Sequence, residues 1–324
     1  MKTKIVYSVV CKSENFFIEQ LYCSVYSLRM YNKNCYVVIV VDSETNKLLE
    51  GKRGLLLPLI DEKIVVDVPN KYTTAQKSRY LKTSLRNHIN GDFLFIDSDT
   101  IITSDISQVD LITDDICAVP DKHMFLREHS DYPFIQESAN RIGWIISDDD
   151  KYYFNSGVMF VKDNPKTRRF YELWHQRWLE TTKPDFHPDQ PSLNMVNKEL
   201  GYPMALLDDK WNCQISDNGL RYLSQALIIH YFNSTIRFER SDYLYYFMNP
   251  CVLHAIKEND LCEKDLFYLK HPLEAFSNKV ILLSGIAREF YFSDFTQWWF
   301  SKYIKKSKFY RVVLSLYSFL KKIK

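Results

Sequence analysis

Glycine is scarce in this sequence, with only 8 among 324 residues, whereas aromatic residues make up 15% of the chain. This composition excludes collagen-like, elastic and low-complexity proteins. The hydrophobic fraction of 46% and the charged fraction of 25% are typical of a folded globular protein. We therefore expect a large core, arranged either as two domains or as one large α/β domain with an appendage.

Closely spaced cysteines and long apolar runs are also absent. The seven cysteines are widely spaced and contain no Cys-x-x-Cys, which argues against a disulfide framework and a zinc cage. We expect free or buried thiols in a reducing cytosol. The apolar start, residues 5–11, is too short for a signal peptide or a membrane span. These absences predict a protein that stays on the cytoplasmic side.

Acidic residues are missing after Asp294, where eight lysines and arginines follow. The whole chain carries a net charge of only +2, which is too little to predict a nucleic-acid partner. Because the tail contributes eight positive charges, the part before it carries a net charge of −6. Residues 308–324 have apolar residues at helical spacing and basic residues on the other side. With the aromatic residues upstream, the segment 296–324 predicts a helix on an anionic membrane surface. The alternative is a terminal helix packed on the body.

Short β-branched runs alternate with amphipathic segments, which indicates a parallel or mixed sheet flanked by helices. The expected strands cover residues 5–10, 37–41, 64–68, 92–102, 116–119, 158–161 and 226–232. The expected helices cover residues 13–31, 73–90, 134–142, 165–180 and 190–197, with Ser13 and Asp189 as N-caps and a turn at 155–157. The alternation is lost beyond about residue 240. We expect an α/β domain over residues 1–240 and a helical extension over 241–324.

Two carboxylates separated by one residue, Asp97-Ser98-Asp99, follow the apolar run 93–96. Ligands of open α/β sheets bind at the carboxyl ends of strands, and hard cations such as Mn²⁺ and Mg²⁺ prefer oxygen ligands. An exposed turn is the simpler alternative. His230, in the apolar run 227–231, is either a core histidine or a neutral imidazole that completes such a site.

Two further pairs carry polar or charged groups that could contact a ligand. Asp189 and Gln190 stand at an expected helix start, where they either only cap the helix or also bind sugar hydroxyls and stabilise positive charge on a reacting carbon. Arg79 and Lys82 lie three residues apart on one face of the helix before the Asp97 strand. Such a pair is either solvated or directed at a phosphate.

Taken in order, five segments resemble glycosyltransferase family 8, which includes glycogenin and bacterial lipopolysaccharide galactosyl- and glucosyltransferases. They are Arg79-Tyr80-Leu81-Lys82, residues 95–100, residues 154–158, Asp189-Gln190 with Asn194, and residues 228–231. The resemblance covers roughly residues 1–235. It implies the GT-A fold, a Rossmann-like nucleotide-diphospho-sugar transferase fold with a mixed sheet flanked by helices.

The resemblance also implies roles for individual residues. Asp97, Asp99 and His230 look like ligands of a Mn²⁺ (or Mg²⁺) ion that holds the diphosphate of a UDP-sugar donor. Asp189 and Gln190 match the catalytic pair beneath the transferred sugar. The donor-binding positions it implies are Ser8, Asn15, Phe16, Arg79, Lys82, Ser98, Asn155, Ser156, Asn233 and Arg237.

One segment departs from the family pattern His-x-x-Gly-x-x-Lys. After His230 the chain has Asn233 in place of the glycine and Ile236 in place of the lysine that touches the diphosphate. Arg237 or Arg240 is the candidate replacement for that charge. The departure leaves the donor sugar and nucleotide open.

The sequence therefore predicts a retaining, metal-dependent glycosyltransferase. It would move a hexose from a UDP-sugar to a saccharide or lipid-linked saccharide acceptor, in surface polysaccharide or lipopolysaccharide synthesis at the inner face of the plasma membrane. Two alternatives stay open: a catalytically silent sugar-nucleotide-binding protein, and a haloacid-dehalogenase-type phosphatase, whose Asp-x-Asp normally follows the first strand. The oligomeric state is not predicted.

Overall fold

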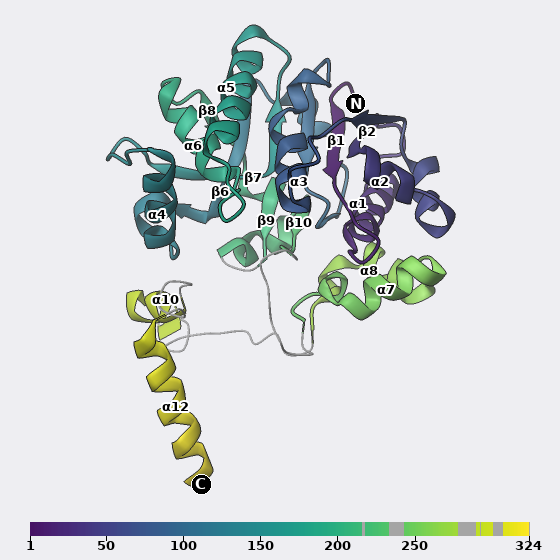
Figure 1. Ribbon diagram of the computed structural model, residues 1–324. Helices are drawn as coiled ribbons and strands as arrows, with labels where there is room; N and C mark the ends of the chain where they lie inside the picture. The colour runs from purple at the N-terminus through teal and green to yellow at the C-terminus, as the bar shows by residue number, and fades with distance from the viewer. Residues whose placement is uncertain (216–217, 233–242, 278–289, 292, 301–306, 324) are drawn as a thin grey trace.

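Two β-sheets organise the protein, for which the computed structural model describes residues 1–215, 218–232, 243–277, 290–291, 293–300 and 307–323. The strands are β1 (Lys4–Val9), β2 (Val37–Asp42), β3 (Glu62–Val66), β4 (Phe93–Ile96), β5 (Thr100–Ile102), β6 (Ile116–Phe125), β7 (Tyr152–Val161), β8 (Met204–Leu206), β9 (Cys213–Gln214) and β10 (Ile228–His230). The large sheet has the order β3-β2-β1-β4-β7-β6-β8, and the small sheet has the order β5-β10-β9 (Figure 1).

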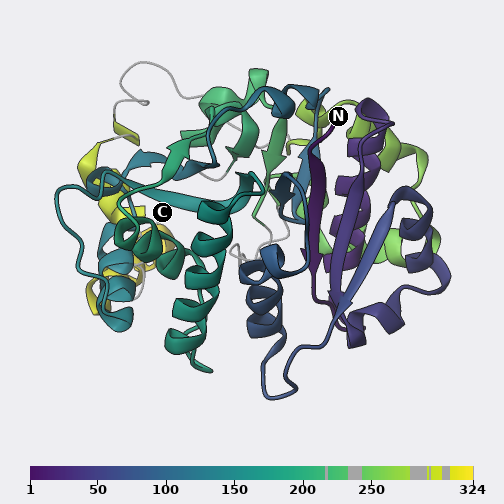
Figure 2. The ribbon, with the colours of Figure 1, turned by 90° about the horizontal axis from the view of Figure 1, so that it is seen from above.

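Helices cover both faces of the large sheet. The α-helices are α1 (Phe17–Tyr31), α2 (Ser43–Leu48), α3 (Thr74–Thr83), α4 (Tyr132–Ile142), α5 (Pro165–Thr181), α6 (Gln190–Glu199), α7 (Pro250–Asn259), α8 (Glu263–Lys270), α10 (Asp294–Phe300) and α12 (Lys308–Ile323). The 3₁₀ segments are η1 (Gly51–Leu59), η2 (Leu85–Asn87), η3 (Ser107–Leu111), η4 (Leu126–Glu128), η5 (Asp209–Asn212), η6 (Asn218–Gln225), η7 (Tyr246–Met248) and η8 (Pro272–Ala275). Figure 2 shows α3 and α5 side by side on one face of the sheet.

The sheet is mixed, as the sequence predicts. Strands β1 to β4 are parallel where they pair, while β7 runs antiparallel to both β4 and β6. Successive residues of β2 are buried on opposite faces of the sheet: Ile39 shares a core cluster with α1, whereas Val38 and Val40 share one with α3 and α5. Burial on both faces of the sheet explains why residues 37–41 of β2 are all apolar.

Two predicted helix boundaries differ from the structure. The first helix begins at Phe17, and the Ser13 hydroxyl bonds the Glu14 side chain, so the predicted N-cap at Ser13 is wrong. The second predicted helix, 73–90, is α3 followed by the short η2. Its start is confirmed, because Thr73 and Gln76 form a reciprocal capping box.

Two predicted strand boundaries also differ, and both lie at the candidate site. The single strand expected over residues 92–102 is two strands, β4 and β5, which belong to different sheets and are separated by residues 97–99. The turn expected at residues 155–157 lies inside β7 instead, because β7 continues past the end of β4 and pairs with β6.

The chain after the second sheet packs on the outer side of α1. Leu253 and Ile256 of α7 and Leu269 of α8 share one apolar core with Cys23 of α1 and Ile229 of β10. The helix α12 confirms the helix predicted near the C-terminus, and it extends away from the two sheets in Figure 1. None of the helices that the structure describes is long and apolar enough to cross a membrane.

Candidate functional site

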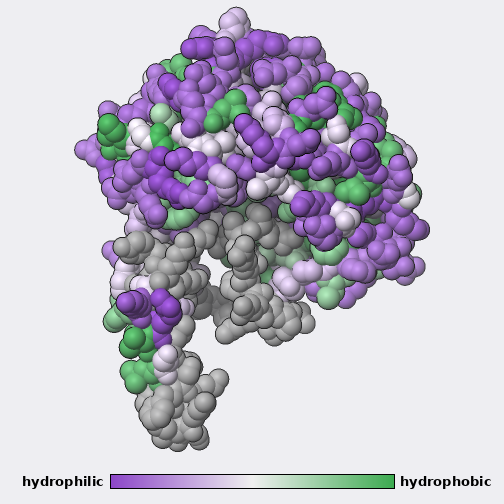
Figure 3. All heavy atoms as spheres, in the orientation of Figure 1, coloured by the Kyte–Doolittle hydropathy of each residue, from purple (hydrophilic) through white to green (hydrophobic). Residues whose placement is uncertain are grey.

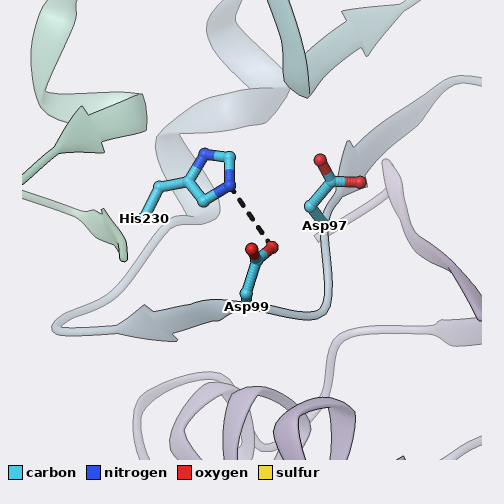
Figure 4. Close-up of side chains that lie close together, drawn as sticks. All are labelled: Asp97, Asp99 and His230. Carbon is cyan, nitrogen blue, oxygen red and sulfur yellow. Dashed lines mark ion pairs between the residues drawn. The ribbon is translucent and has the colours of Figure 1, made fainter. Parts of the chain in front are cut away.

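Three candidate metal ligands meet where β4 ends. Asp97 follows β4 and Asp99 precedes β5, while His230 ends β10 and pairs with Thr100 across the small sheet. One ligand atom of each lies within 4.8 Å of the others, and the His230 Nε2 atom is 3.3 Å from Asp99 Oδ1 (Figure 4). Antiparallel pairing of β5 with β10 is therefore what brings a histidine 131 positions away to the aspartates.

The imidazole of His230 is oriented by Asn212. The His230 Nδ1 atom lies 2.9 Å from Asn212 Oδ1, so Nδ1 donates its proton to that oxygen. The lone pair of Nε2 then faces the aspartates, as metal coordination by a neutral imidazole requires. The ring of Phe232 stacks on the imidazole at a centroid distance of 3.9 Å.

Hydrogen bonds between the side-chain amides of Asn155 and Asn212 fix which end of the Asn212 amide faces His230. Asn155 Nδ2 donates to Asp121 Oδ1 at 2.7 Å, and Asn212 Nδ2 donates to Asn155 Oδ1 at 2.9 Å. The Asp121 carboxylate can only accept, so each amide must present its nitrogen toward Asp121 and its oxygen toward His230. At the far end, Asp121 Oδ2 lies 3.0 Å from His129 Nε2, whose Nδ1 accepts the Asp131 amide proton.

Gly157 has no side chain, and this leaves room for the His230 ring and the Asn155 amide. A Cβ atom there would overlap His230 Cε1 and would lie 2.8 Å from Asn155 Oδ1. The Gly157 carbonyl also accepts the Asp97 amide proton at 2.7 Å. Glycine at this position therefore allows β7 to approach His230 and Asp97 together.

Asp189 forms a second carboxylate centre beside the first. Its oxygens lie 3.0 Å from Arg79 Nε and 3.7 Å from Lys82 Nζ, and Ser156 Oγ donates to it at 2.8 Å. Asp189 is the N-cap residue of α6, as predicted, but its side chain makes no capping hydrogen bond and is directed to these partners instead. Burial alone would raise the pKa of Asp189, but Lys82, Arg79 and Ser156 bring it below its ordinary value.

Lys82 links the two carboxylate centres. Its ammonium lies 3.0 Å from both oxygens of Asp97 and is buried above the Phe95 ring. Burial raises the pKa of Asp97 above its ordinary value, although Lys82 opposes the rise. Burial also acts to raise the pKa of Asp99, but His230, the Asp99 backbone and Lys82 together outweigh it and lower that pKa.

The start of α6 is fixed from two sides. Trp174 Nε1 donates to the Asp189 carbonyl at 3.0 Å, and Asn194 exchanges two hydrogen bonds with the Phe154 backbone of β7. Gln190 is half-buried and is the first residue of α6. Asp189 and Gln190 are thus held on a braced helix start next to β7.

The other predicted donor-binding residues divide into three groups. Ser98 lies between the two aspartates, and Ser8 lies near the carboxyl end of β1. Asn15 and Phe16 precede α1, where the Asn15 carbonyl accepts a bond from Arg53 and the Phe16 ring contacts His254. Asn233 and Arg237 lie outside the described residues.

Sequence reasoning missed the residues that orient the site, namely Asn212, Asp121 and His129. They carry no motif, and they come from η5, β6 and the segment after η4. A polar residue directly after an apolar strand start, as at Asp121, is the only signal that the sequence offers for them.

The residues present fit a divalent cation. Two carboxylates and an imidazole nitrogen converge, and the second imidazole nitrogen is bonded to an amide oxygen that fixes its tautomer. Oxygen and nitrogen donors without a thiolate suit Mn²⁺ or Mg²⁺.

Comparisons with known proteins agree with this fold. The family model described as nucleotide-diphospho-sugar transferase matches residues 33–265. No curated protein matches the chain. Among solved structures, galactosyltransferase LgtC in complex with donor and acceptor sugar analogues is 15% identical, with a TM-score of 0.50 over 81% of this chain and 98% of that one.

Two other solved structures are similar at the same level. An active-site mutant of LgtC is 14% identical, with a TM-score of 0.50 over 81% of this chain and 98% of that one. The apo form of mouse xyloside xylosyltransferase 1 is 15% identical, with a TM-score of 0.48 over 73% of this chain and all of that one. The family model covers well over half of the chain and the architecture is the GT-A fold, so the protein belongs to the nucleotide-diphospho-sugar transferase family.

Proposed function

We propose that this transferase is a retaining, metal-dependent enzyme of the family 8 type that moves a hexose from a UDP-sugar to a saccharide or lipid-linked saccharide. The observation that carries the proposal is the convergence of Asp97, Asp99 and His230 beside the Asp189–Lys82 pair. The two carboxylate centres correspond to the two parts of such a donor, its diphosphate and its sugar ring.

The proposed chemistry separates charge between these two centres. Asp97, Asp99 and His230 would hold a divalent cation, which would supply a Lewis acid for the negative charge that develops on the diphosphate. Lys82 and Arg79 keep Asp189 ionised, so its carboxylate can stabilise the cationic character of the anomeric carbon. Gln190 follows Asp189 at the start of α6 and would supply an amide beside the same carboxylate.

Donor recognition is proposed along the carboxyl edge of the large sheet. Ser8, near the carboxyl end of β1, and Asn15 and Phe16, between β1 and α1, would contact the uracil and ribose. Arg79 is suited to the diphosphate, since its side chain is 34% exposed while its Nε is held by Asp189. The family lysine is Ile236 here, so the phosphate charge would be met by Arg79 and by Arg237 or Arg240.

A catalytically silent nucleotide-sugar binder of the same fold is the second candidate. The observation that favours it is Ile236 at the family's lysine position. Hydrolysis of the UDP-sugar in the absence of acceptor, dependent on Mn²⁺, distinguishes an active transferase from such a binder.

We also propose that the C-terminal segment binds an anionic membrane surface, where a lipid-linked acceptor for surface polysaccharide or lipopolysaccharide synthesis would be found. On α12, Phe309, Val312 and Leu316 are exposed at spacings of three and four residues, and Lys308 and Arg311 are exposed as well. Figure 3 shows hydrophobic and hydrophilic residues beside one another on this helix.

The decisive experiment is a thermal-shift and calorimetric screen of UDP, GDP and CMP sugars, each with and without Mn²⁺. We expect one UDP-sugar to stabilise the protein only with Mn²⁺, and Asp99→Ala to abolish that effect. Asp114→Ala, an exposed carboxylate at the other end of the sheet, is the matched control and should behave like the unaltered chain. Stabilisation by no sugar nucleotide, or equal stabilisation of Asp99→Ala, would refute the proposed donor site.

A further inference from the structure

A hollow of ≈ 590 Å³ lies at the carboxyl edge of the large sheet, beyond the metal-ligand candidates. The end of β6, the start of β7 and the end of β8 line it, through His123, Phe125, Tyr152, Leu206 and the following Asp208 and Asp209. Because β8 and β4 run in the direction of β6, and β7 runs against them, these ends share the edge at which β4 ends. The hollow therefore belongs to the ligand-binding edge of the fold.

The lining has the chemistry of a sugar-binding surface. The rings of Phe125 and Tyr152 stack at a centroid distance of 5.2 Å, and Phe125 is 50% exposed. A flat aromatic face packs against the C–H face of a pyranose, and the neighbouring carboxylates of Asp208 and Asp209 can accept bonds from its hydroxyls. The described residues of the lining include no lysine or arginine, which favours a neutral sugar over an anionic one.

A strained segment connects the hollow to the candidate active site. Lys122 and His123 have consecutive positive φ angles of 56°, which non-glycine residues rarely adopt. Gln214 holds this conformation: its Oε1 accepts the Lys122 amide proton at 2.7 Å, and its Nε2 donates to the Pro120 carbonyl at 3.0 Å. His123 is held as well, with Nδ1 2.6 Å from Asp209 Oδ1.

The unusual backbone conformation at Lys122 and His123 accompanies a change in the direction in which the side chains of β6 point. The register between β6 and β7 shifts on both sides of Pro120. Asp121 thereby bonds Asn155 of the site, while Phe125 stacks on Tyr152 in the hollow. Bulges of this kind are typical of strands that shape a binding site.

The separation of the two places sets the size of the ligand. Tyr152 precedes Gly157 by five residues, which is about 17 Å of extended strand. The Gly157 carbonyl accepts the Asp97 amide proton, and the absence of a side chain at Gly157 leaves room for the His230 ring. A single sugar ring cannot occupy both places, whereas an oligosaccharide can.

We infer that the hollow is an acceptor subsite, which binds a neutral sugar unit of an oligosaccharide several units from the hydroxyl that receives the transferred hexose. The inference rests on the proposed function and deepens it by naming the acceptor class.

The test uses the full-length chain and a set of neutral oligosaccharides, namely lactose, maltotriose and chitotriose, in ligand-observed saturation-transfer NMR. We expect at least one of them to bind, Phe125→Ala to weaken that binding up to about tenfold, and Phe125→Tyr to restore it. Phe267→Ala in α8, which removes an aromatic ring of 44% exposure elsewhere, is the matched control and should not change binding.

Two outcomes would overturn the subsite: no oligosaccharide of the set binds, or Phe125→Ala binds it as tightly as the unaltered chain. Displacement of the oligosaccharide by n-butanol would overturn it as well, because it would show that the hollow is a general apolar pocket without preference for sugars. UDP binding in the presence of Mn²⁺, measured calorimetrically on the same samples, separates the two proposals. An unaltered chain that does not bind UDP refutes the proposed function, whereas UDP binding without any effect of Phe125→Ala refutes only the subsite.

Discussion

At the scale of single residues, the orientation of His230 depends on groups that are distant in the sequence. The Asp121 carboxylate fixes the direction of the Asn155 amide, which fixes Asn212, which in turn fixes the proton of His230. Outer groups of this kind typically change metal affinity 10- to 100-fold when they are lost. Substitutions that disturb the imidazole should therefore be detected first as a loss of metal affinity.

Gly157→Ala is the sharpest such substitution. The new methyl group would overlap His230 Cε1, so the imidazole must move away from the aspartates. We expect Mn²⁺ affinity, measured by electron paramagnetic resonance or calorimetry, to fall at least about tenfold. Gly54→Ala is the matched control, because its Cβ would lie 3.6 Å from its nearest neighbour, an ordinary contact. Unchanged Mn²⁺ affinity in Gly157→Ala would show that His230 does not bind the metal.

His175 makes folding stability depend on pH. Burial lowers its pKa to about 4, and its Nδ1 lies 2.8 Å from the Thr83 hydroxyl. Between the ordinary pKa of 6.5 and pH 4, the unfolded chain binds a proton that the folded chain does not. The free energy of unfolding should therefore fall as the pH falls through this window, by at most about 1.4 kcal/mol per pH unit from this group.

Urea unfolding at a series of pH values measures this contribution. His175→Gln keeps a hydrogen-bonding side chain but cannot titrate, so its stability should fall less steeply between pH 6.5 and 4. His271→Gln, at an exposed position, is the control and should keep the slope of the unaltered chain. Parallel curves for His175→Gln and the unaltered chain would contradict the assignment.

At the scale of elements, α3 carries Arg79 and Lys82, the two basic side chains of the site. The first turn of this helix is stabilised by a side-chain cap. Thr73 Oγ1 accepts the Gln76 amide proton at 3.2 Å, and Gln76 Oε1 accepts the Thr73 amide proton at 3.0 Å. Thr73→Ala should lower the free energy of unfolding by about 1 kcal/mol, measured by urea denaturation. Thr73→Ser preserves the hydroxyl and should lose little. Equal destabilisation by both variants would show that the methyl group matters and the cap does not.

The apolar strands could be predicted from the sequence because burial on both faces leaves a continuous run, as in β2. The start of α3 could be predicted because its cap is local. The break between β4 and β5 could not, since it arises from pairing with β10 more than 100 residues away. The extended conformation of residues 155–157 likewise comes from β6, a distant partner.

The same distinction applies to the candidate site. Asp97 and Asp99 could be predicted because a strand end places them at the ligand edge, and Asp189 because it starts a helix. The roles of Asn212 and Asp121 depend only on tertiary contacts, and no local pattern predicts them. The role of Lys82 as a link between two carboxylates also emerges only from the packing of α3 against β4.

At the scale of the whole molecule, the acidic body and the basic tail differ in how they use apolar residues. Residues 243–276 contribute to a core with α1 and β10, in which Tyr245 and Phe247 are fully buried. On α12, in contrast, Val312 is 65% exposed and Leu316 is 57% exposed. The boundary at residue 240 between a transferase domain and an extension stays a prediction.

The exposed apolar face of α12 gives the last prediction. Each lysine or arginine near an anionic bilayer contributes about 1 kcal/mol of attraction, and apolar side chains that enter the interface add to it. We therefore expect the full-length chain to bind vesicles that contain phosphatidylglycerol, and truncation after Asp294 to abolish binding. The full-length double variant Val312→Ser, Leu316→Ser should weaken it without changing the charge.

Vesicle flotation measures this binding, and salt distinguishes its components. Binding of the full-length chain should weaken as ionic strength rises, because screening reduces the attraction of the basic residues. Phe134→Ser, which removes an aromatic side chain of 37% exposure from α4, is the control for exposed apolar residues in general and should bind as the unaltered chain does. If the truncated chain still floats with the vesicles, the membrane contact lies on the body, and α12 must have another partner.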